Sequence, residues 1–134
     1  MKKILLDNNA YIAYLSGDER VLDELASSEI VYLSVFVLGE LYAGFRGGTK
    51  YKNNKSILEQ FLKKPTVEIL AGTETTADIF GQLKNSLKTS GTPIPVNDIW
   101  IAAHALETGS ILITHDAHFL KCPGLRLWDH VTVG

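Results

Sequence analysis

Short runs of apolar, mostly branched residues alternate along the chain with longer segments in which apolar residues recur every three or four positions. The short runs are typical of buried strands, and the longer segments are typical of helices that bury one face. This alternation predicts an α/β fold of three layers, α/β/α, around a mostly parallel central sheet of about five strands. We expect the strands at residues 4–6, 30–33, 67–70, 111–114 and 125–128.

Capping residues and helix breakers indicate where the helices begin and end. Asn9, Asp18, Ser34 and Asn97 each precede a helical pattern and are expected to be N-caps. The Pro93-Ile94-Pro95 segment is expected to be extended, because proline interrupts a helix. The expected helices cover residues 10–15, 19–26, 35–46, 49–64, 73–91 and 98–107.

The length of 134 residues, with 46% hydrophobic and 21% charged residues, predicts one globular domain over residues 1–134. No apolar run approaches the ~18 residues that a membrane-spanning helix needs, so we expect no membrane segment. The first apolar run stops at Asp7-Asn8-Asn9, too early for a signal peptide, and this favours a cytoplasmic location. A lone Cys122 excludes an internal disulfide.

Four acidic residues lie where exposed acids are not expected. Asp7 directly follows the first predicted strand, and Asp116 follows the fourth after one residue. Asp98 lies in the first turn of a predicted helix. Glu40 lies in mid-helix among apolar residues, where an uncompensated carboxylate is costly, beside a Gly39 that would let a ligand or another backbone approach. Because the carboxyl ends of parallel strands meet at one edge, we expect one acidic pocket.

Taken singly, three of these acids have structural explanations, since Asp7 could form an Asx turn, Asp98 could favour a helix N-terminus and Asp116 could cap a turn. Taken together, they repel one another by about 4 kcal/mol per pair at 4 Å and an effective dielectric near 20. Such a cluster requires protons or a cation. Oxygen ligands favour Mg²⁺ or Mn²⁺ over zinc, and these ions suit phosphodiester hydrolysis.

Four segments carry a resemblance to a known family, and a fifth, Pro123–Leu127, extends it to the end of the chain. In this order and spacing they are similar to PIN domains, and more narrowly to VapC-type toxins of bacterial and archaeal type II toxin–antitoxin modules. The four segments are Ile4–Asn9, Leu33–Leu41, Pro93–Ala103 and Thr114–Phe119.

The resemblance implies a PIN-like fold and an endoribonuclease that depends on Mg²⁺ or Mn²⁺. It implies that one or two ions activate a water for in-line attack on an RNA phosphate, and that their ligands are Asp7, Glu40, Asp98 and Asp116. It further implies a homodimer that a VapB-type antitoxin keeps silent, with DNA contacted only through the antitoxin. Relatives in this family cut transfer RNA or ribosomal RNA.

Three polar residues are candidates to support the site or to position a water. Asn8 stands where the family commonly has threonine or serine, and its amide can both donate and accept. Asn9 could bind a metal-bound water, although capping is the simpler role. Thr114 lies two residues before Asp116 and matches the family, but it could equally be an ordinary strand residue.

A basic strip separates two acidic parts of the chain. Residues 46–64 carry a net charge of +5, whereas residues 1–45 carry −4 and residues 65–134 carry −3. This strip could contact RNA phosphates, or it could be the solvated face of one helix. The candidate RNA contacts are Arg46, Lys50, Lys52, Lys55 and His115.

Other readings of the sequence are weaker. His115, His118 and Cys122 could begin a zinc site, but only the distant His104 or His130 could supply the fourth ligand. A receiver domain would need a second acid beside Asp7, where this chain has asparagine. A non-catalytic RNA-binding or assembly module of the same fold is the main alternative, although it would have no reason to keep four repelling carboxylates.

Overall fold

A computed structural model describes residues 1–129, and His130 and the residues after it lie outside this description. All strand pairs in the sheet are parallel, and the strand order is β3-β2-β1-β4. The predicted parallel sheet is therefore confirmed, with four strands instead of about five. The strands are β1 (Lys3–Leu6), β2 (Ile30–Ser34), β3 (Val67–Leu70) and β4 (Ile111–Ile113).

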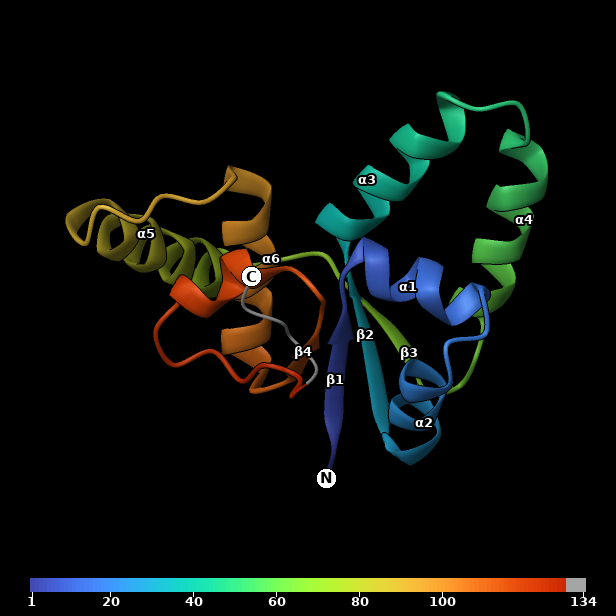
Figure 1. The fold of residues 1–134 in the computed structure, drawn as a ribbon, viewed down its shortest axis with the longest axis horizontal. Helices are drawn as coiled ribbons and strands as arrows, with labels where there is room; N and C mark the ends of the chain where they lie inside the picture. Colours follow the sequence, from blue (N-terminus) through green and yellow to red (C-terminus); the bar gives the residue numbers. More distant parts are fainter. Residues whose placement is uncertain (130–134) are drawn as a thin grey trace.

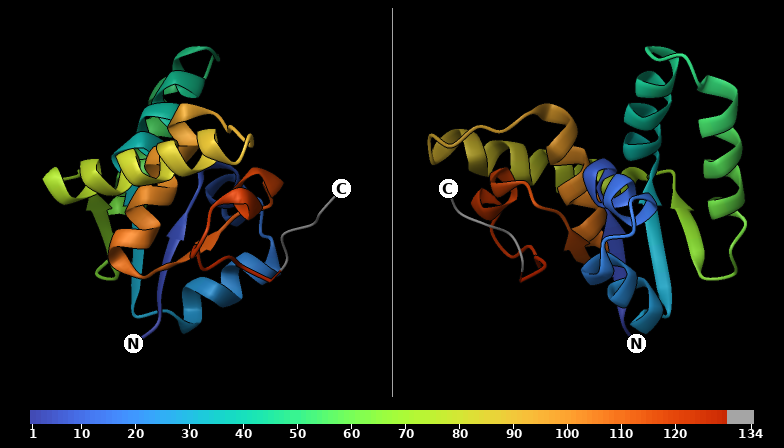
Figure 2. Two further views of the ribbon diagram at one scale, coloured as in Figure 1. Left: turned by 90° about the vertical axis from the view of Figure 1, so that its left-hand side faces the viewer. Right: turned by 45° about the vertical axis from the view of Figure 1, so that its right-hand side comes forward.

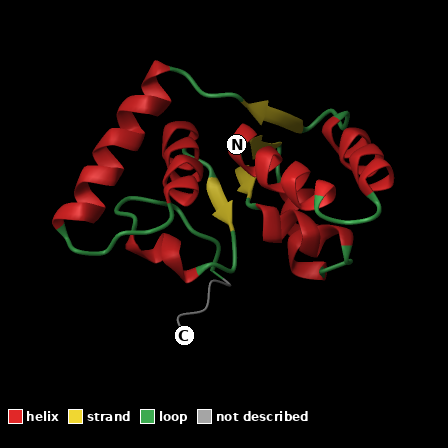
Figure 3. Cartoon of the chain, turned by 90° about the horizontal axis from the view of Figure 1, so that it is seen from above, coloured by secondary structure: helices red, strands yellow, loops and turns green. Residues whose placement is uncertain are grey.

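Helices cover both sides of the sheet. In Figures 1 and 3, α5 and α6 lie on one side of the strands and α1 and α2 lie on the other, which confirms the predicted layers. The hairpin formed by α3 and α4 projects beyond the ends of the strands (Figure 2). The helices are α1 (Asn8–Leu15), α2 (Glu19–Ser27), α3 (Val35–Arg46), α4 (Tyr51–Leu62), α5 (Glu74–Thr89), α6 (Val96–Thr108) and the 3₁₀ helix η1 (Ala117–Lys121).

The predicted fifth strand at residues 125–128 is wrong. In its place a single parallel bridge joins Leu127 to Leu112 of β4. Two backbone hydrogen bonds hold it, from Leu112 to the Arg126 carbonyl at 2.8 Å and from Trp128 to the Leu112 carbonyl at 3.0 Å. The returning segment therefore pairs with β4 at one position only and does not form a fifth strand.

The N-cap of α1 is Asp7, and the prediction of Asn9 is wrong. The Asp7 Oδ1 accepts a hydrogen bond from the Ala10 N–H at 2.8 Å, so the helix begins two residues earlier than expected. Asn9 lies exposed in the first turn. Asp7 occupies the N-cap because it directly follows β1, where the backbone still has the extended conformation of an N-cap residue.

The N-cap of α6 is Pro95, and the prediction of Asn97 is also wrong. The Pro95 carbonyl accepts hydrogen bonds from the N–H groups of Asp98 at 3.0 Å and Ile99 at 3.3 Å. Asn97 therefore lies inside the first turn. The Pro93–Pro95 segment before it is extended, as predicted.

The predicted apolar side of the polar segment 49–64 is buried. Leu58 is fully buried on α4, and Phe61 packs its edge against the Tyr11 ring of α1 at 5.3 Å between ring centres. These contacts attach the projecting hairpin to the body of the protein. Among the described residues, no helix is both long and apolar enough to cross a bilayer.

Replacing Leu58 with alanine should lower the free energy of unfolding by about 2–5 kcal/mol, because it leaves a cavity in the core. Ile57 precedes it on the same helix but is partly exposed, so Ile57→Ala should cost no more than about 1 kcal/mol. Urea denaturation of both variants measures the difference. Equal losses would show that α4 does not attach through the Leu58 side.

Candidate functional site

Asp7 lies at the carboxyl end of β1 and is almost fully buried, with 4% of its surface exposed. One carboxylate oxygen accepts the Ala10 N–H, and the other accepts a hydrogen bond from the Thr114 hydroxyl. Thr114 follows β4, and its hydroxyl oxygen also accepts the N–H of Asp116 at 2.9 Å. One threonine thus links the Asp7 carboxylate to the backbone that carries Asp116.

Asp116 and Asp98 meet around His118. The Asp116 Oδ1 accepts the backbone N–H of His118 at 2.9 Å, as the cap of η1. The His118 Nδ1 lies 3.2 Å from this oxygen and 3.4 Å from the Asp98 Oδ2. One ligand atom of each of the three residues lies within 4.8 Å of the others, a spacing that a metal ion could bridge.

Glu40 faces the same region from α3. It lies beside Asn97 in a shallow groove of about 440 Å³ that Val35 and Phe36 also line. Its Oε1 is buried and has no hydrogen-bond partner among residues 1–129. The expected close approach at Gly39 is not made by the described chain, since a Cβ there would meet no atom within 4 Å.

Burial and mutual repulsion raise the pKa values of three of these carboxylates. Burial is the main cause for Asp7, and the hydrogen bonds from Thr114 and Ala10 partly oppose it. Burial also raises the pKa of Glu40, against the effect of the Asn97 amide, and the charges of Asp98 and Asp7 add to the rise. The pKa of Asp98 rises through burial and then through the charge of Asp116, and His118 partly opposes both.

This donor set fits a divalent cation. Within the described residues, no lysine or arginine lies within salt-bridge distance of Asp7, Glu40, Asp98 or Asp116. Within the described residues, the buried Oε1 of Glu40 has no hydrogen-bond partner, and the clustered oxygens of Asp98 and Asp116 have only His118 as a basic neighbour. Carboxylate oxygens are the ligands that hard cations such as Mg²⁺ and Mn²⁺ prefer.

The remaining candidates lie at the edge of this region or away from it. Asn8 is half-buried at the start of α1, and Asn9 is exposed. The ring of His115 packs against Trp128, with 5.2 Å between ring centres, and takes no part in the acidic cluster. No zinc site forms around Cys122 in the described part of the chain, where His104 bonds Ser34 instead.

The basic candidates lie on the projecting hairpin. Arg46 ends α3, Lys50 precedes α4, and Lys52 and Lys55 lie in its first turns. The Arg46 guanidinium stacks over the Tyr51 ring at 4.4 Å and donates to its hydroxyl at 2.9 Å. Glu40 and Arg46 are six residues apart on α3, which is about 9 Å along a helix. The basic group therefore begins a short distance from the acidic site.

Two residues near the carboxylates were not predicted from the sequence as part of the acidic site: His118 was considered for a zinc site, and Asn97 was expected only to cap a helix. His118 follows Asp116 by two residues, and the turn that Asp116 caps brings its ring back over the carboxylates. Asn97 directly precedes Asp98 in the first turn of α6 and lies next to Glu40. The signal in the sequence was that each lies within two residues of a predicted site residue. That signal is weak, because histidine in a turn and asparagine at a helix start are also ordinary structural choices.

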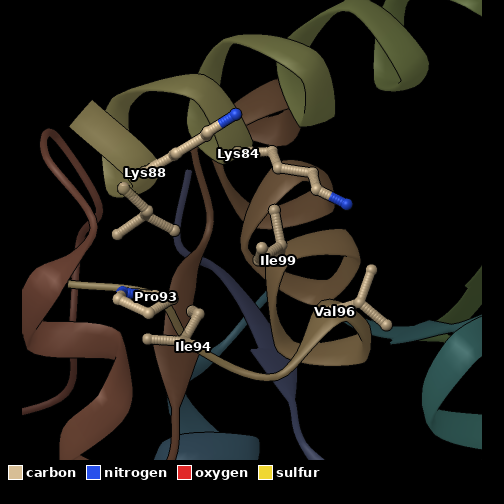
Figure 4. A pocket seen from close by; sticks show the side chains of 7 residues that line it. Lys84, Lys88, Pro93, Ile94, Val96 and Ile99 are labelled. Carbon is tan, nitrogen blue, oxygen red and sulfur yellow. The ribbon is translucent and has the colours of Figure 1, made fainter. Parts of the chain in front are cut away.

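A separate cavity of about 280 Å³ lies between α5 and the start of α6. Apolar side chains form its floor, among them Ile94, Val96 and Ile99, and Lys84 and Lys88 border it on the α5 side (Figure 4). None of the four carboxylates lines this cavity. The acidic site is therefore distinct from this apolar cavity.

Comparison with known proteins places this geometry in a family. The PIN domain profile matches residues 4–125. The ribonuclease VapC1 of Haemophilus influenzae strain R2866 is 30% identical over 130 residues, which cover 93% of this chain and 96% of that protein. The ribonuclease VapC2 of Rickettsia felis is 32% identical over 111 residues, which cover 81% of each chain.

Solved structures agree with this assignment. The VapBC2 complex of Rickettsia felis, bound to a DNA fragment from its promoter, contains a chain that matches with a TM-score of 0.82 and 28% identity, covering 94% of this chain and 97% of that one. The DNA-bound VapBC of Salmonella typhimurium matches with a TM-score of 0.83 and 27% identity, covering 96% and 98%. Together with the carboxylates at the carboxyl edge of a parallel sheet, these matches show that the chain is a nuclease that belongs to the PIN domain family and, within it, to the VapC ribonucleases.

Proposed function

We propose that this chain is the toxin of a toxin–antitoxin module and cleaves RNA internally with the help of Mg²⁺ or Mn²⁺. The observation that carries the proposal is an acidic cluster without a lysine or arginine partner in the described residues. Asp98 and Asp116 lie at ligand spacing beside His118. Asp7 and Glu40 lie outside that group but close enough for their charges to interact with it. A non-catalytic PIN module would gain nothing from this repulsion.

The four carboxylates Asp7, Glu40, Asp98 and Asp116 would hold the cation. When bound, a divalent ion would act as a Lewis acid on the phosphate and would activate water as the nucleophile for in-line attack. The protein itself orients the ligands. The Ala10 N–H and the Thr114 hydroxyl fix the two oxygens of Asp7, and the His118 N–H fixes one oxygen of Asp116.

The α3–α4 hairpin is the proposed RNA contact. Its cations lie at the exposed tip, and Tyr51 offers an aromatic ring among them. Lysine and arginine bind phosphates irrespective of sequence, so this surface would supply affinity and not base choice. The tRNA(fMet)-specific endonuclease VapC of Salmonella typhimurium, 27% identical over 132 residues, supports transfer RNA as the substrate, with ribosomal RNA as the other possibility.

The proposed partner is a VapB-type antitoxin. Three of the matched structures are VapBC complexes, two of them bound to DNA, and these support an antitoxin partner. In this proposal the antitoxin covers the nuclease groove and itself contacts DNA. We also propose that the chain forms a homodimer and acts in the cytoplasm. The partly exposed Val35, which lines the groove, is apolar surface of the kind that a protein partner covers.

Single substitutions Asp7→Asn, Glu40→Gln and Asp98→Asn should each reduce the rate of RNA cleavage in Mg²⁺ by about 100-fold or more, since a cation site contributes several kcal/mol to the transition state. Circular dichroism should show that each variant remains folded. Asp78→Asn, on the exposed surface of α5, is the matched control and should cleave at the normal rate. A folded site variant as active as the parent would remove that residue from the site.

Repulsion among the carboxylates of the acidic site should also affect the melting temperature (Tm). Because the folded-state pKa of Asp98 is raised, its charge disfavours the folded state as the pH rises through that pKa. In EDTA, Asp98→Asn should therefore raise the Tm at pH 7.5, and the gain should shrink toward pH 5. Millimolar Mg²⁺ or Mn²⁺ should raise the Tm of the parent but not of Asp98→Asn. Scanning calorimetry measures both effects. A parent Tm that does not change when the metal is added would contradict a preformed cation site.

Removing the hairpin cations should weaken RNA binding without changing the chemical step. The triple variant Lys50→Ala, Lys52→Ala and Lys55→Ala should raise KM, leave kcat unchanged and reduce the slope of log Kd against log salt by about 2–3. Lys63→Ala lies in the same basic strip but just past the other end of α4, and should change neither KM nor the slope. If Lys63→Ala acts like the hairpin substitutions, the effect comes from net charge alone.

A further inference from the structure

A buried hydrogen bond outside the acidic site joins the two helices that carry Glu40 and Asp98. The His104 Nδ1 of α6 lies 2.7 Å from the Ser34 Oγ at the end of β2. Both residues are buried, with 1% and 0% of their surfaces exposed. A bond of this kind has no solvent to compete with it and holds its partners strongly.

Ser34 has a second role that favours one direction for this bond. Its Oγ accepts the Phe36 N–H at 3.1 Å and so caps α3. If Ser34 donates its hydroxyl proton to the His104 Nδ1, the other ring nitrogen, Nε2, carries the ring proton. In the opposite tautomer Nδ1 carries the ring proton and donates it to the Ser34 Oγ, which leaves the Ser34 hydroxyl proton as well as Nε2 without a partner. The first arrangement satisfies more groups, and burial, which lowers the pKa of His104, keeps the ring neutral.

Aromatic packing strengthens the same junction. The Phe36 ring, in the first turn of α3, lies 5.8 Å from the His104 ring and stacks on Trp100 of α6 at 5.0 Å. Glu40 lies six residues after Ser34, and Asp98 lies six residues before His104. Each carboxylate is therefore about 9 Å along its helix from the bond. A change in the distance between α3 and α6 at this junction would therefore shift both carboxylates.

The Nε2 of His104 makes no hydrogen bond within residues 1–129. It faces a cavity of about 250 Å³ that Gly72, Thr76 and Glu107 also line, and a Cβ on Gly72 would come within 3.4 Å of it. Within residues 1–129, the His104 ring therefore hydrogen-bonds through Nδ1 alone, to Ser34. A substitution that keeps or removes an acceptor at the Nδ1 position keeps or removes this one bond.

We propose that His104 is a positioning residue, which through its hydrogen bond to Ser34 holds α3 and α6 at the spacing that brings Glu40 to the cation shared with Asp98. The proposal rests on the metal-dependent activity proposed above. His104 touches neither the cation nor RNA, and its effect passes through Ser34 and the two helices. Displacement of a ligand by about 1 Å can cost on the order of 100-fold in rate.

Two amide variants separate the bond from the bulk of the ring. Asparagine places an amide group where Nδ1 lies, so His104→Asn keeps an acceptor for Ser34. Glutamine places its amide near Nε2, so His104→Gln loses that acceptor. In His104→Gln the Kd for Mn²⁺, measured by calorimetry, should rise at least tenfold and kcat should fall at least tenfold, with KM for RNA unchanged. His104→Asn should stay within about threefold of the parent in each.

Ser34→Ala removes the bond to His104 and also the cap of α3, so it should be at least as impaired as His104→Gln. The double variant should be no worse than Ser34→Ala, as expected for two ends of one interaction. Leu58→Ala controls for lost stability, and should leave the Kd for Mn²⁺ unchanged at a temperature where it is folded. Nitrogen NMR of the imidazole should show a proton on Nε2 and none on Nδ1.

The outcomes distinguish this proposal from the proposed function. Equal metal affinity in the parent and His104→Gln, or equal losses in His104→Asn and His104→Gln, would overturn the positioning role. If either variant fails to fold, Ser34→Ala alone decides, and unchanged affinity there has the same meaning. A parent protein that binds Mn²⁺ but does not cleave RNA would instead overturn the proposed function and leave the affinity comparison valid.

Discussion

Parallel pairing of all four strands is the constraint on which the site depends. It directs every strand end toward the same edge, so Asp7 after β1 and Thr114 after β4 become neighbours through the register that pairs Leu6 with Ile113. The Asp7 N–H donates to the Ile113 carbonyl at 3.3 Å and continues this pairing beyond the strands. An antiparallel arrangement would send one of the two residues to the opposite end of the sheet.

The cost of this arrangement is electrostatic, and hydrogen bonds offset part of it. The Thr114 hydroxyl donates a hydrogen bond to the Asp7 carboxylate and accepts one from the Asp116 N–H, so it connects the two acids without direct contact between them. His118 lies against Asp98 and Asp116 and is the nearest basic group among the described residues. Burial still raises the pKa values of Asp7, Glu40 and Asp98, which suits a site that a cation completes.

The sheet positions only half of the site, and helices supply the rest. The positions of Glu40 and Asp98 depend on how α3 and α6 pack against each other. The stacked rings of Phe36 and Trp100, and the bond between Ser34 and His104, hold that junction. The same helix α3 continues into the hairpin that carries the basic residues, so one rigid element relates the acidic site to the proposed RNA surface.

The alternation of strands and helices follows from the amino-acid sequence alone, because the apolar runs of β1, β2 and β3 and the apolar periodicity of α4 are local patterns. It also marked the four acids, since carboxylates after strands or among apolar residues stand out in a linear pattern. The N-caps at Asp7 and Pro95 and the loss of a fifth strand were decided by the folded backbone, where neighbouring residues compete for the same hydrogen bonds. Only the tertiary structure brought His118 to Asp98 and His104 to Ser34, because contacts across 20 and 70 residues depend on how helices pack and leave no periodic trace in the chain.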